Sequence, residues 1–430
     1  MFSDVRLRGS PVEQSVRNEW KANWSLVLAA SLGFSFFTIM IASSGLFFEP
    51  LQAEFGWSRT LLSSGPSIAS ILTAVLGPFA GALIDRYGSR RVVLPGLVLT
   101  IGSVMSFALT SGAELQWVGL WVIFGIVAVS IKSTAWTAAV LGVFDRSRGL
   151  ALGLTLSGTA VAQIIVPPLA NWLIMVVGWR EAFVWLALGW GGLTFVVCAF
   201  FLFDAHDRHR APGQQANNRP VDNILSGLTT REALRDSALW RLAISNFVVM
   251  LLTMGLTIHM FPILTEAGIS RSSAAWLTSL SGVAAICGKL ITGFLLDRFK
   301  PNWTGGITLG AAALAFLLLD QGRSSPTLIV IAMLVNGYAA GTKTQITGQL
   351  TAAYGGMKNF GKIYSVMAAL MALAAGLGPT VAGAIYDYAG SYGPFLAIGV
   401  IGCVLGGGLM ISLPAYPAGH GASRQAPSKG

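Results

Sequence analysis

Three lysines stand inside long apolar segments of this chain, where a positive charge is costly. They are Lys132, Lys289 and Lys343, and each lies in a run long enough to cross a lipid bilayer. A lysine at the centre of a spanning helix costs roughly 2.5 to 3.5 kcal/mol on insertion scales. Charged residues at that depth usually face a water-filled cavity or a partner charge. The three residues therefore indicate a binding site for an anion.

The sequence offers these lysines no acidic partner, because no aspartate or glutamate occupies the middle of an apolar segment. A cavity with up to three positive charges favours an anionic substrate and disfavours cationic drugs. The alternative is that the lysine side chains reach the membrane interface, as long side chains near helix ends do. Lys132 lies about 11 residues from the end of its segment, roughly 16 Å at 1.5 Å per residue, which is beyond the reach of a lysine stem.

Neutral polar side chains in the same segments are candidates for hydrogen bonds to the substrate. Trp136, one helical turn from Lys132, either covers an apolar part of the substrate or packs against a neighbouring helix. His259 is the histidine that falls within a span, and it is a candidate for proton coupling because imidazole titrates between about pH 5 and 8. A hydrogen-bonded packing role is its alternative. The neutral candidates are Asn246, Gln163, Tyr338 and Tyr364.

The composition places these residues in a protein that crosses a membrane many times. Of 430 residues, 54% are hydrophobic and 11% are charged, whereas soluble proteins carry roughly 25% charged residues. The net charge of +10 is scattered over short loops, which argues against a nucleic-acid partner. The three cysteines lie in apolar segments without metal-ligand spacing, so we expect no metal, cofactor or disulfide framework.

Apolar spans of about 20 residues match a hydrocarbon core about 30 Å thick. The loops on one side of the predicted spans, with both termini, hold 21 Lys or Arg residues, and those on the other side hold four. By the positive-inside rule, both termini face the cytoplasm. We predict twelve helical spans, at roughly 25–48, 59–83, 92–110, 116–143, 149–177, 182–203, 240–265, 272–296, 303–320, 326–353, 361–386 and 392–413.

The two halves of the chain match at a constant shift of 212 residues. Pro50 pairs with Pro262, and EFGWSR (54–59) pairs with EAGISR (266–271). Repeats of six helices enter the membrane from the same side, so they predict two parallel halves around a shared cleft. We expect a cytoplasmic tail over 1–24, six-helix bundles over 25–203 and 240–413, a cytoplasmic linker over 204–239 and a cytoplasmic tail over 414–430.

Within the linker, residues 228–240 predict a short amphipathic helix. Thr229 and Glu232 have the spacing of a capping box, in which each side chain bonds the backbone N–H of the other residue. The linker is interpreted as a tether between the two halves, and a regulatory contact is the alternative.

The loop GALIDRYGSRR (81–91) resembles the cytoplasmic signature of the major facilitator superfamily, and GFLLDRFKPNW (293–303) is its counterpart in the repeat. The resemblance implies an all-α membrane fold of two pseudo-symmetric six-helix bundles and transport by alternating access. In that family the loop is a conformational gate, and a basic topology anchor is the alternative. The residues implied for the gate are Gly81, Asp85, Arg86, Arg90, Asp297 and Arg298.

FFEPLQAEFGWSR (47–59) and VFDRSRGLALGLTLSGTAV (143–161) resemble the monocarboxylate and oxalate/formate branch of this superfamily, in its bacterial form. Lys289 occupies the position where that branch has a substrate-binding arginine in the eighth helix. Lysine keeps the charge but lacks the bidentate fork that matches a carboxylate. The aspartate that animal members carry one turn earlier is Ala285 here, so their proton pathway does not carry over as a whole.

We therefore expect a monomeric secondary transporter in the bacterial cytoplasmic membrane. It would import a small organic anion, in the first place a monocarboxylate, together with protons, and Lys289 ranks ahead of Lys132 and Lys343 as the anion ligand. Exchange or efflux of organic anions is the alternative, and a receptor that does not transport is a further one. An enzyme is disfavoured because the chain has no zinc-helix motif, phosphate loop or triad spacing.

Overall fold

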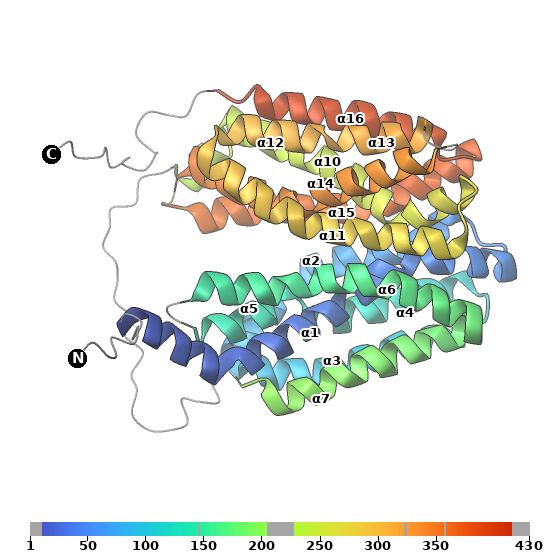
Figure 1. Ribbon diagram of the computed structural model, residues 1–430, viewed down its shortest axis with the longest axis horizontal. Coiled ribbons are helices and arrows are strands. Elements are labelled where there is room, and N and C mark those ends of the chain that lie inside the picture. Colours follow the sequence, from blue (N-terminus) through green and yellow to red (C-terminus); the bar gives the residue numbers. More distant parts are fainter. Residues whose placement is uncertain (1–10, 145–146, 204–227, 322–324, 357, 415–430) are drawn as a thin grey trace, which may run out of the picture. The chain divides into compact units, whose positions relative to one another are not determined.

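The computed structural model describes residues 11–144, 147–203, 228–321, 325–356 and 358–414. Residues 204–227 of the predicted linker (204–239), residues 1–10 of the predicted N-terminal tail (1–24) and residues 415–430 of the predicted C-terminal tail (414–430) lie outside the described residues. The elements of the described chain are helices (Figure 1), which confirms the prediction of an all-α protein. They pack into two compact units, which are described separately below.

Unit 1 comprises residues 1–40, 75–162 and 173–216. Its helix α3 packs against α4, α5 and α7, and an aromatic cluster of Phe107, Trp117, Trp121 and Phe183 fills its core. The elements wholly within unit 1 are α3 (Ser89–Ser106), η1 (Phe107–Leu109), α4 (Glu114–Ala128), η2 (Val129–Ile131), α5 (Ser133–Leu141), η3 (Leu186–Gly191) and α7 (Gly192–Phe201).

Unit 2 comprises residues 41–74, 163–172 and 217–430. Helix α10 packs on α15 and α16, α11 packs on α14, and α12 and α13 follow one another along α16 (Figure 1). Its whole elements are α9 (Thr230–Ala233), α10 (Ser237–Glu266), α11 (Arg271–Arg298), α12 (Pro301–Gly310), α13 (Ala312–Gln321), α14 (Pro326–Gly355), α15 (Phe360–Ala389) and α16 (Gly393–Ile411).

Three long helices contribute to both units. They are α1 (Pro11–Phe55), α2 (Arg59–Tyr87) and α6 (Arg148–Trp185). Helix α1 begins well before residue 25, so polar turns precede its apolar part. The division into bundles over 25–203 and 240–413 stays a prediction.

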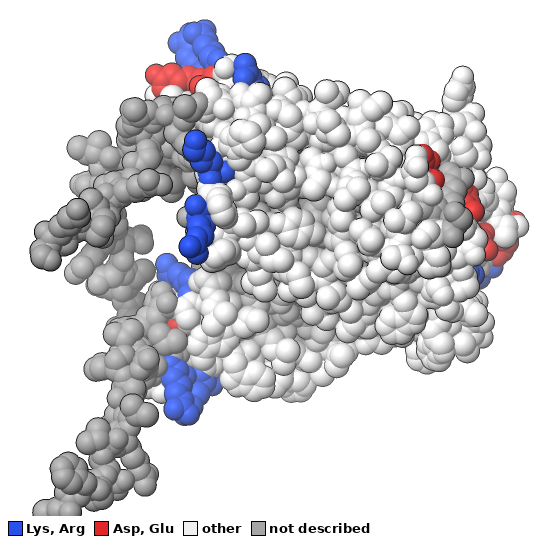
Figure 2. Space-filling model, turned by 45° about the horizontal axis from the view of Figure 1, so that its top comes forward, with Lys and Arg blue, Asp and Glu red and all other residues white. Residues whose placement is uncertain are grey.

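Ten helical segments of the described chain are long and apolar enough to cross a membrane. The longest, Arg148–Phe201, covers two predicted spans, and Gly178 interrupts its helical geometry with a φ of 84°. In the view of Figure 2, the surface beside the Lys and Arg side chains at one border is free of charge over a broad stretch. The chain is therefore a multi-pass membrane protein, and the number twelve stays a prediction.

The helix that carries Lys132 is interrupted, although the sequence predicts a continuous span over 116–143. Helix α4 ends at Ala128, and Lys132 has extended backbone angles of φ −71° and ψ 168° before α5 begins. The interruption leaves the Ile131 carbonyl without its helical partner, and the Trp136 indole N–H donates to it at 2.7 Å. The predicted span is present as Glu114–Leu141, and the interruption within it, where a side chain replaces the backbone donor, is a feature that the sequence did not predict.

The capping box before α9 is confirmed. The Thr229 backbone N–H donates to the Glu232 carboxylate at 2.7 Å, and the Glu232 N–H donates to the Thr229 hydroxyl at 3.3 Å. The bond from Thr229 holds the pKa of Glu232 below its ordinary value. Helix α9 ends at Ala233, and the Asp236 carboxylate caps α10 by accepting from Leu239 N–H at 2.9 Å. The stretch 228–240 therefore holds one short helix and the start of α10.

Candidate functional site

A cavity of about 150 Å3 lies within unit 2. Its walls come from α10, α11 and α14 and from the stretches of α1 and α6 that belong to this unit. Among the described residues that line the cavity, Lys343 is the one with a charged side chain. The other polar lining residues are Gln163, Thr257, Thr278, Ser281, Asn336 and Thr344, and the apolar ones are Ile41, Ala42, Pro167, Met250, Met254, Met260, Gly337 and Ala340.

Lys343 reaches this cavity from the middle of α14 and is only 4% exposed. Its ammonium group donates a hydrogen bond to the Thr253 hydroxyl on α10. Within the described part of the chain, the ion pairs join Arg59 to Glu266 and Arg271 to Glu49, so none of them involves Lys343. A buried cation without an acidic partner is costly, and a bound anion would compensate it.

One turn further along α14, Thr347 fixes the orientation of this part of the helix pair. Its hydroxyl lies 2.8 Å from the Lys343 carbonyl and 2.9 Å from the Asn246 amide oxygen on α10. The Asn246 amide nitrogen donates to the Leu242 carbonyl at 2.9 Å. Asn246, a predicted substrate ligand, is thus buried in the contact between α10 and α14 and is not part of the cavity lining.

The cavity has an apolar side in addition to its polar one. Met250 and Met254 lie one turn apart on α10, and Met260 follows toward the end of the same helix. Methionine is flexible and polarizable, so it adapts to apolar groups of varied shape. Gln163, which the sequence indicated as a candidate ligand, belongs to the lining together with Asn336. The site therefore suits a small molecule with a charged end and an apolar end.

Three further predicted ligands lie elsewhere in unit 2. Lys289 is exposed on α11 and is not in the cavity lining. The Tyr338 hydroxyl lies 2.9 Å from the Thr292 hydroxyl and joins α14 to α11. Tyr364 stacks on Phe360 at a ring distance of 5.4 Å in the first turns of α15. The structure thus brings Lys343 and Gln163 together and leaves Lys289, Tyr338 and Tyr364 outside this cavity.

Lys132 and Trp136 belong to unit 1. Trp136 is fully buried, and its ring packs against Gly33 of α1 so closely that a methyl group there would lie 2.1 Å from it. Of the two roles considered for Trp136, packing against a neighbouring helix is the one that the structure shows. Lys132 stands at the start of α5, where the helix is interrupted.

His259 is fully buried near the end of α10, with both ring nitrogens in hydrogen bonds. Nε2 lies 3.0 Å from the Pro379 carbonyl, which can only accept, so Nε2 carries a hydrogen. Nδ1 lies 2.6 Å from the Tyr392 hydroxyl. The Phe48 ring meets the imidazole edge at 5.3 Å between centroids. His259 is therefore held in a hydrogen-bonded network and is not itself among the residues that line the cavity.

The network continues into a group of charged residues, here called the outer cluster: Arg59, Glu266, Asp387 and Tyr392. Arg59 donates to the Tyr392 hydroxyl at 2.7 Å and pairs with the Glu266 carboxylate at 2.6 Å. Its guanidinium lies over the Tyr386 ring, 4.0 Å from the centroid. The cluster lies at the end of unit 2 that the charge bias predicts to face away from the cytoplasm.

Asp387 of the outer cluster caps the beginning of α2. Its carboxylate accepts from the backbone N–H groups of Arg59 at 3.0 Å and Thr60 at 2.7 Å. A carboxylate at a helix N-terminus is favoured by the free N–H groups and by the helix dipole. The end of α15 is thereby attached to the start of α2.

Sequence reasoning missed the outer cluster, although the internal repeat contains a signal for it. At the shift of 212 residues, Arg59 and Arg271 occupy equivalent positions. Arg271 pairs with Glu49, while Arg59 pairs with Glu266, so each arginine binds a glutamate of the other repeat. A pocket of about 230 Å3 lies over these pairs, lined by Glu49, Arg59, Glu266, Phe48, Phe261, Pro262 and Thr265.

The residues that the loop signature implies for the gate lie in different surroundings. Arg90 donates to the Ala199 and Leu202 carbonyls at 2.7 and 3.0 Å and so caps the end of α7. Arg86 and Arg298 are exposed, and a methyl group at Gly81 would meet nothing within 4 Å. The side chains of Asp85 and Asp297 lie outside the described residues. The gating role of this loop stays a prediction.

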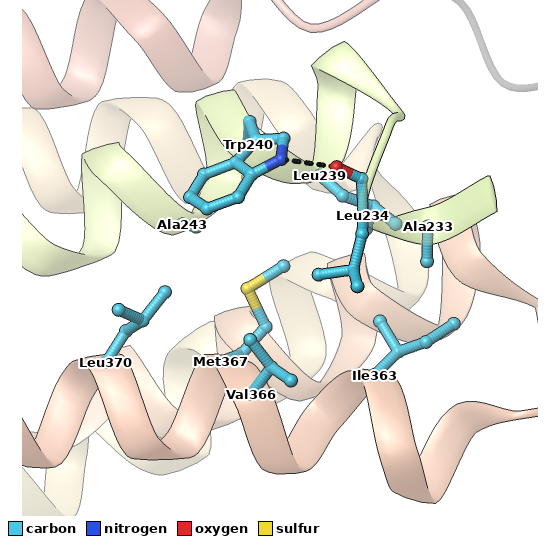
Figure 3. A pocket seen from close by; sticks show the side chains of 9 residues that line it. All are labelled: Ala233, Leu234, Leu239, Trp240, Ala243, Ile363, Val366, Met367 and Leu370. Atoms are coloured by element: carbon cyan, nitrogen blue, oxygen red, sulfur yellow. Dashed lines mark hydrogen bonds between the residues drawn. The ribbon is translucent and has the colours of Figure 1, made fainter. Parts of the chain in front are cut away.

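A shallow groove between the start of α10 and α15 is a further hollow of unit 2 (Figure 3). Ala233, Leu234, Trp240, Ile363 and Met367 contribute to its lining, which is apolar, and its volume is about 30 Å3. The Trp240 indole N–H donates to the Leu234 carbonyl at 2.8 Å and is not free to bind a ligand. The groove offers no group that would recognise an anion.

Comparisons with known proteins show which family the chain resembles. The family model described as Major Facilitator Superfamily matches residues 26–267 and 242–430. A monocarboxylate transporter 13 of Rattus norvegicus is 25% identical over 91% of this chain and 89% of its own length. A probable sulfoacetate transporter SauU of Cupriavidus necator is 26% identical over 85% of this chain and 87% of its own length.

Solved structures show the same fold. A bacterial homologue of the human lysosomal transporter Spinster, in an inward-facing and unoccupied conformation, aligns with a TM-score of 0.62. The alignment covers 94% of this chain and 95% of that one, at 16% sequence identity.

Proposed function

The chain belongs to the Major Facilitator Superfamily, and we propose that it is a secondary transporter for a small organic anion. In this proposal twelve spans form two six-helix bundles, and the substrate crosses the membrane by alternating access between them. The observation that carries the proposal is Lys343, a buried ammonium in a cavity whose described lining residues include no carboxylate. An anion would supply the opposite charge that the protein does not.

The size of the cavity limits the substrate. An apolar cavity of about 150 Å3 is large enough for benzene, so the cavity of unit 2 admits an acid with about six non-hydrogen atoms. Short monocarboxylates such as lactate have this size, and sulfoacetate is larger by about two non-hydrogen atoms; monocarboxylates and sulfoacetate are the substrates in the relatives' names. The methionines would contact the carbon chain, and Lys343 with Asn336 and Gln163 would contact the acid group.

This proposal changes the ranking of the three lysines as ligands of the anion. Lys343 comes first because it lines the cavity, and Lys289, which the family resemblance favours, becomes the comparison residue. Proton-coupled import remains the proposed direction and coupling, with anion exchange or efflux as the alternative. His259 is the proposed proton site.

Uptake by proteoliposomes tests the proposal. The purified protein is reconstituted, and the entry of radiolabelled acetate, lactate and sulfoacetate is measured with and without an inward proton gradient. Uptake of at least one acid above that of protein-free vesicles is expected, and a proton gradient should increase it. Absence of flux for all three acids, with or without a counter-anion inside, would overturn the proposal.

A further inference from the structure

We propose that Tyr392 couples the protonation of His259 to the opening of the outer cluster. The coupling is argued from the described contacts alone. Its role in transport rests on the proposed function. Tyr392 acts as a positioning residue that joins the imidazole to Arg59.

The hydrogen atoms in the network can be assigned from chemistry. Arg59 can only donate, so the Tyr392 oxygen accepts its hydrogen at 2.7 Å. Phenols are protonated at neutral pH, and the Tyr392 hydrogen is then directed to Nδ1 of His259, 2.6 Å away. Nε2 donates its hydrogen to the Pro379 carbonyl. When the imidazole is neutral, each donor in these three hydrogen bonds has an acceptor.

A second proton on His259 conflicts with this arrangement. It would sit on Nδ1 and point at the Tyr392 oxygen, which already accepts from Arg59. Two cations would then share one phenol oxygen, and the phenol hydrogen would lose its acceptor. The imidazolium would also be fully buried, where a charge without an opposite partner is costly. Protonated His259 and the closed cluster therefore exclude one another.

Opening the cluster removes the conflict. When Tyr392 and Arg59 separate from His259, the imidazolium is hydrated and the guanidinium no longer competes for the phenol. Protonation then favours separation of α2 from the end of α15, which Asp387 and Arg59 hold together in the closed state. For a single coupled proton, the open-to-closed ratio can change by up to about tenfold per pH unit.

A path for the proton is available. The pocket of about 230 Å3 over the outer cluster is lined by Phe48, and the Phe48 ring packs on the imidazole. A small movement of this ring would connect the pocket with His259. The charged and titratable groups around the imidazole are Arg59 on α2, Asp387 and Tyr386 on α15, Tyr392 before α16 and Glu266 on α10. Glu49 on α1, which lines the outer pocket, is paired with Arg271 on α11.

The test measures opening directly and needs no substrate. Ser63 is fully buried on α2, and its hydroxyl lies 2.6 Å from the Arg59 carbonyl. A methyl group at Gly383 of α15 would lie 2.6 Å from the same hydroxyl, so Ser63 lies in the contact between these two helices. The variant Ser63→Cys reports separation of the helices through its reaction with a polar thiol reagent.

The experiment uses the full chain in nanodiscs, with the exposed Cys287 replaced by serine. Reaction rates at Ser63→Cys are measured between pH 5 and 8 and divided by those at Gln321→Cys. Gln321 is exposed, so the ratio removes the intrinsic pH dependence of the thiol. The ratio is expected to rise several-fold as the pH falls.

Two variants make the test specific to the proposed contact. In His259→Gln, the amide can accept from Tyr392 and donate to Pro379 without titrating, so the ratio should stay low at all pH values. The carboxylates of the cluster are unchanged in this variant, which therefore controls for their contribution. In Tyr392→Phe, the ring is kept and the hydroxyl is lost, so the ratio should be high and independent of pH.

Either of two results would overturn the coupling: a ratio in the unmodified background that does not change with pH, or an unchanged pH dependence in His259→Gln. Neither result bears on anion transport, which is measured by uptake. Conversely, failure of the uptake experiment would leave the measured pH dependence of opening in place.

Discussion

The Arg59 guanidinium and the Glu266 carboxylate are 2.6 Å apart, and they join the first residue of α2 to the last residue of α10. The arginine is 11% exposed and the glutamate 34%. The equivalent arginine of the second repeat, Arg271, is bound to Glu49, which is 60% exposed. Two ion pairs related by the repeat thus differ in burial, and this difference leads to the first prediction.

Replacing Arg59 with glutamine should weaken the closed state more than replacing Arg271 with glutamine. Hydrogen bonds to charged groups contribute about 1.5 to 3 kcal/mol, whereas an exposed ion pair contributes about 0 to 1 kcal/mol. The reaction of a cysteine at Ser63 should accelerate by roughly tenfold or more in Arg59→Gln. It should change little in Arg271→Gln, and equal effects of the two variants would contradict the prediction.

Lys343→Gln should abolish binding of small organic anions, because the cavity then offers hydrogen bonds but no charge. Lys289→Gln is the matched control, since it removes the same charge from an exposed position of the neighbouring helix α11. Binding is measured by thermal shift with lactate and sulfoacetate. A loss of binding in Lys289→Gln together with normal binding in Lys343→Gln would assign the anion to the other lysine.

Met254→Ala should widen the substrate range toward longer acids. The methionine lines the apolar side of a cavity of about 150 Å3, and its truncation adds space for further methylene groups. Competition by acids of increasing chain length against labelled lactate measures the change. The variant Met410→Ala is the control, because Met410 is buried on α16 outside the cavity lining. A chain-length preference equal to that of the unmodified protein would show that Met254 does not contact the substrate.

Gly33→Ala should destabilise unit 1, because the added methyl group would lie 2.1 Å from the Trp136 ring. Overpacking of this kind costs typically about 1 to 3 kcal/mol. Gly81→Ala is the matched control, since nothing lies within 4 Å of a methyl group there. Thermal unfolding in detergent should show a lower midpoint for Gly33→Ala only. An alanine at an open helical position should by itself be neutral or stabilising, so a similar loss in both variants would show that the contact with Trp136 does not decide the effect.

Local features of the fold could be predicted from the sequence. Long apolar segments, a shortage of charge and the loop signature indicated a helical membrane protein of this superfamily. This was possible because each segment by itself has the length to cross the membrane and pairs its own backbone hydrogen bonds as a helix. The capping box at Thr229 and Glu232 was likewise predicted, since its two residues are neighbours in the chain. The interruption at Lys132 was not, because it depends on an indole donor that competes with the backbone.

The sequence by itself determined the class of protein, the positions of the apolar segments and the three lysines within them. Only the tertiary structure decided that Lys343 lines a cavity, that Trp136 packs on Gly33 and that Arg59 meets Glu266 and Tyr392. A segment that is apolar on all sides has no periodicity from which the facing of a side chain can be read. Contacts between residues more than 200 positions apart, such as Arg59 and Glu266, depend on how the helices pack.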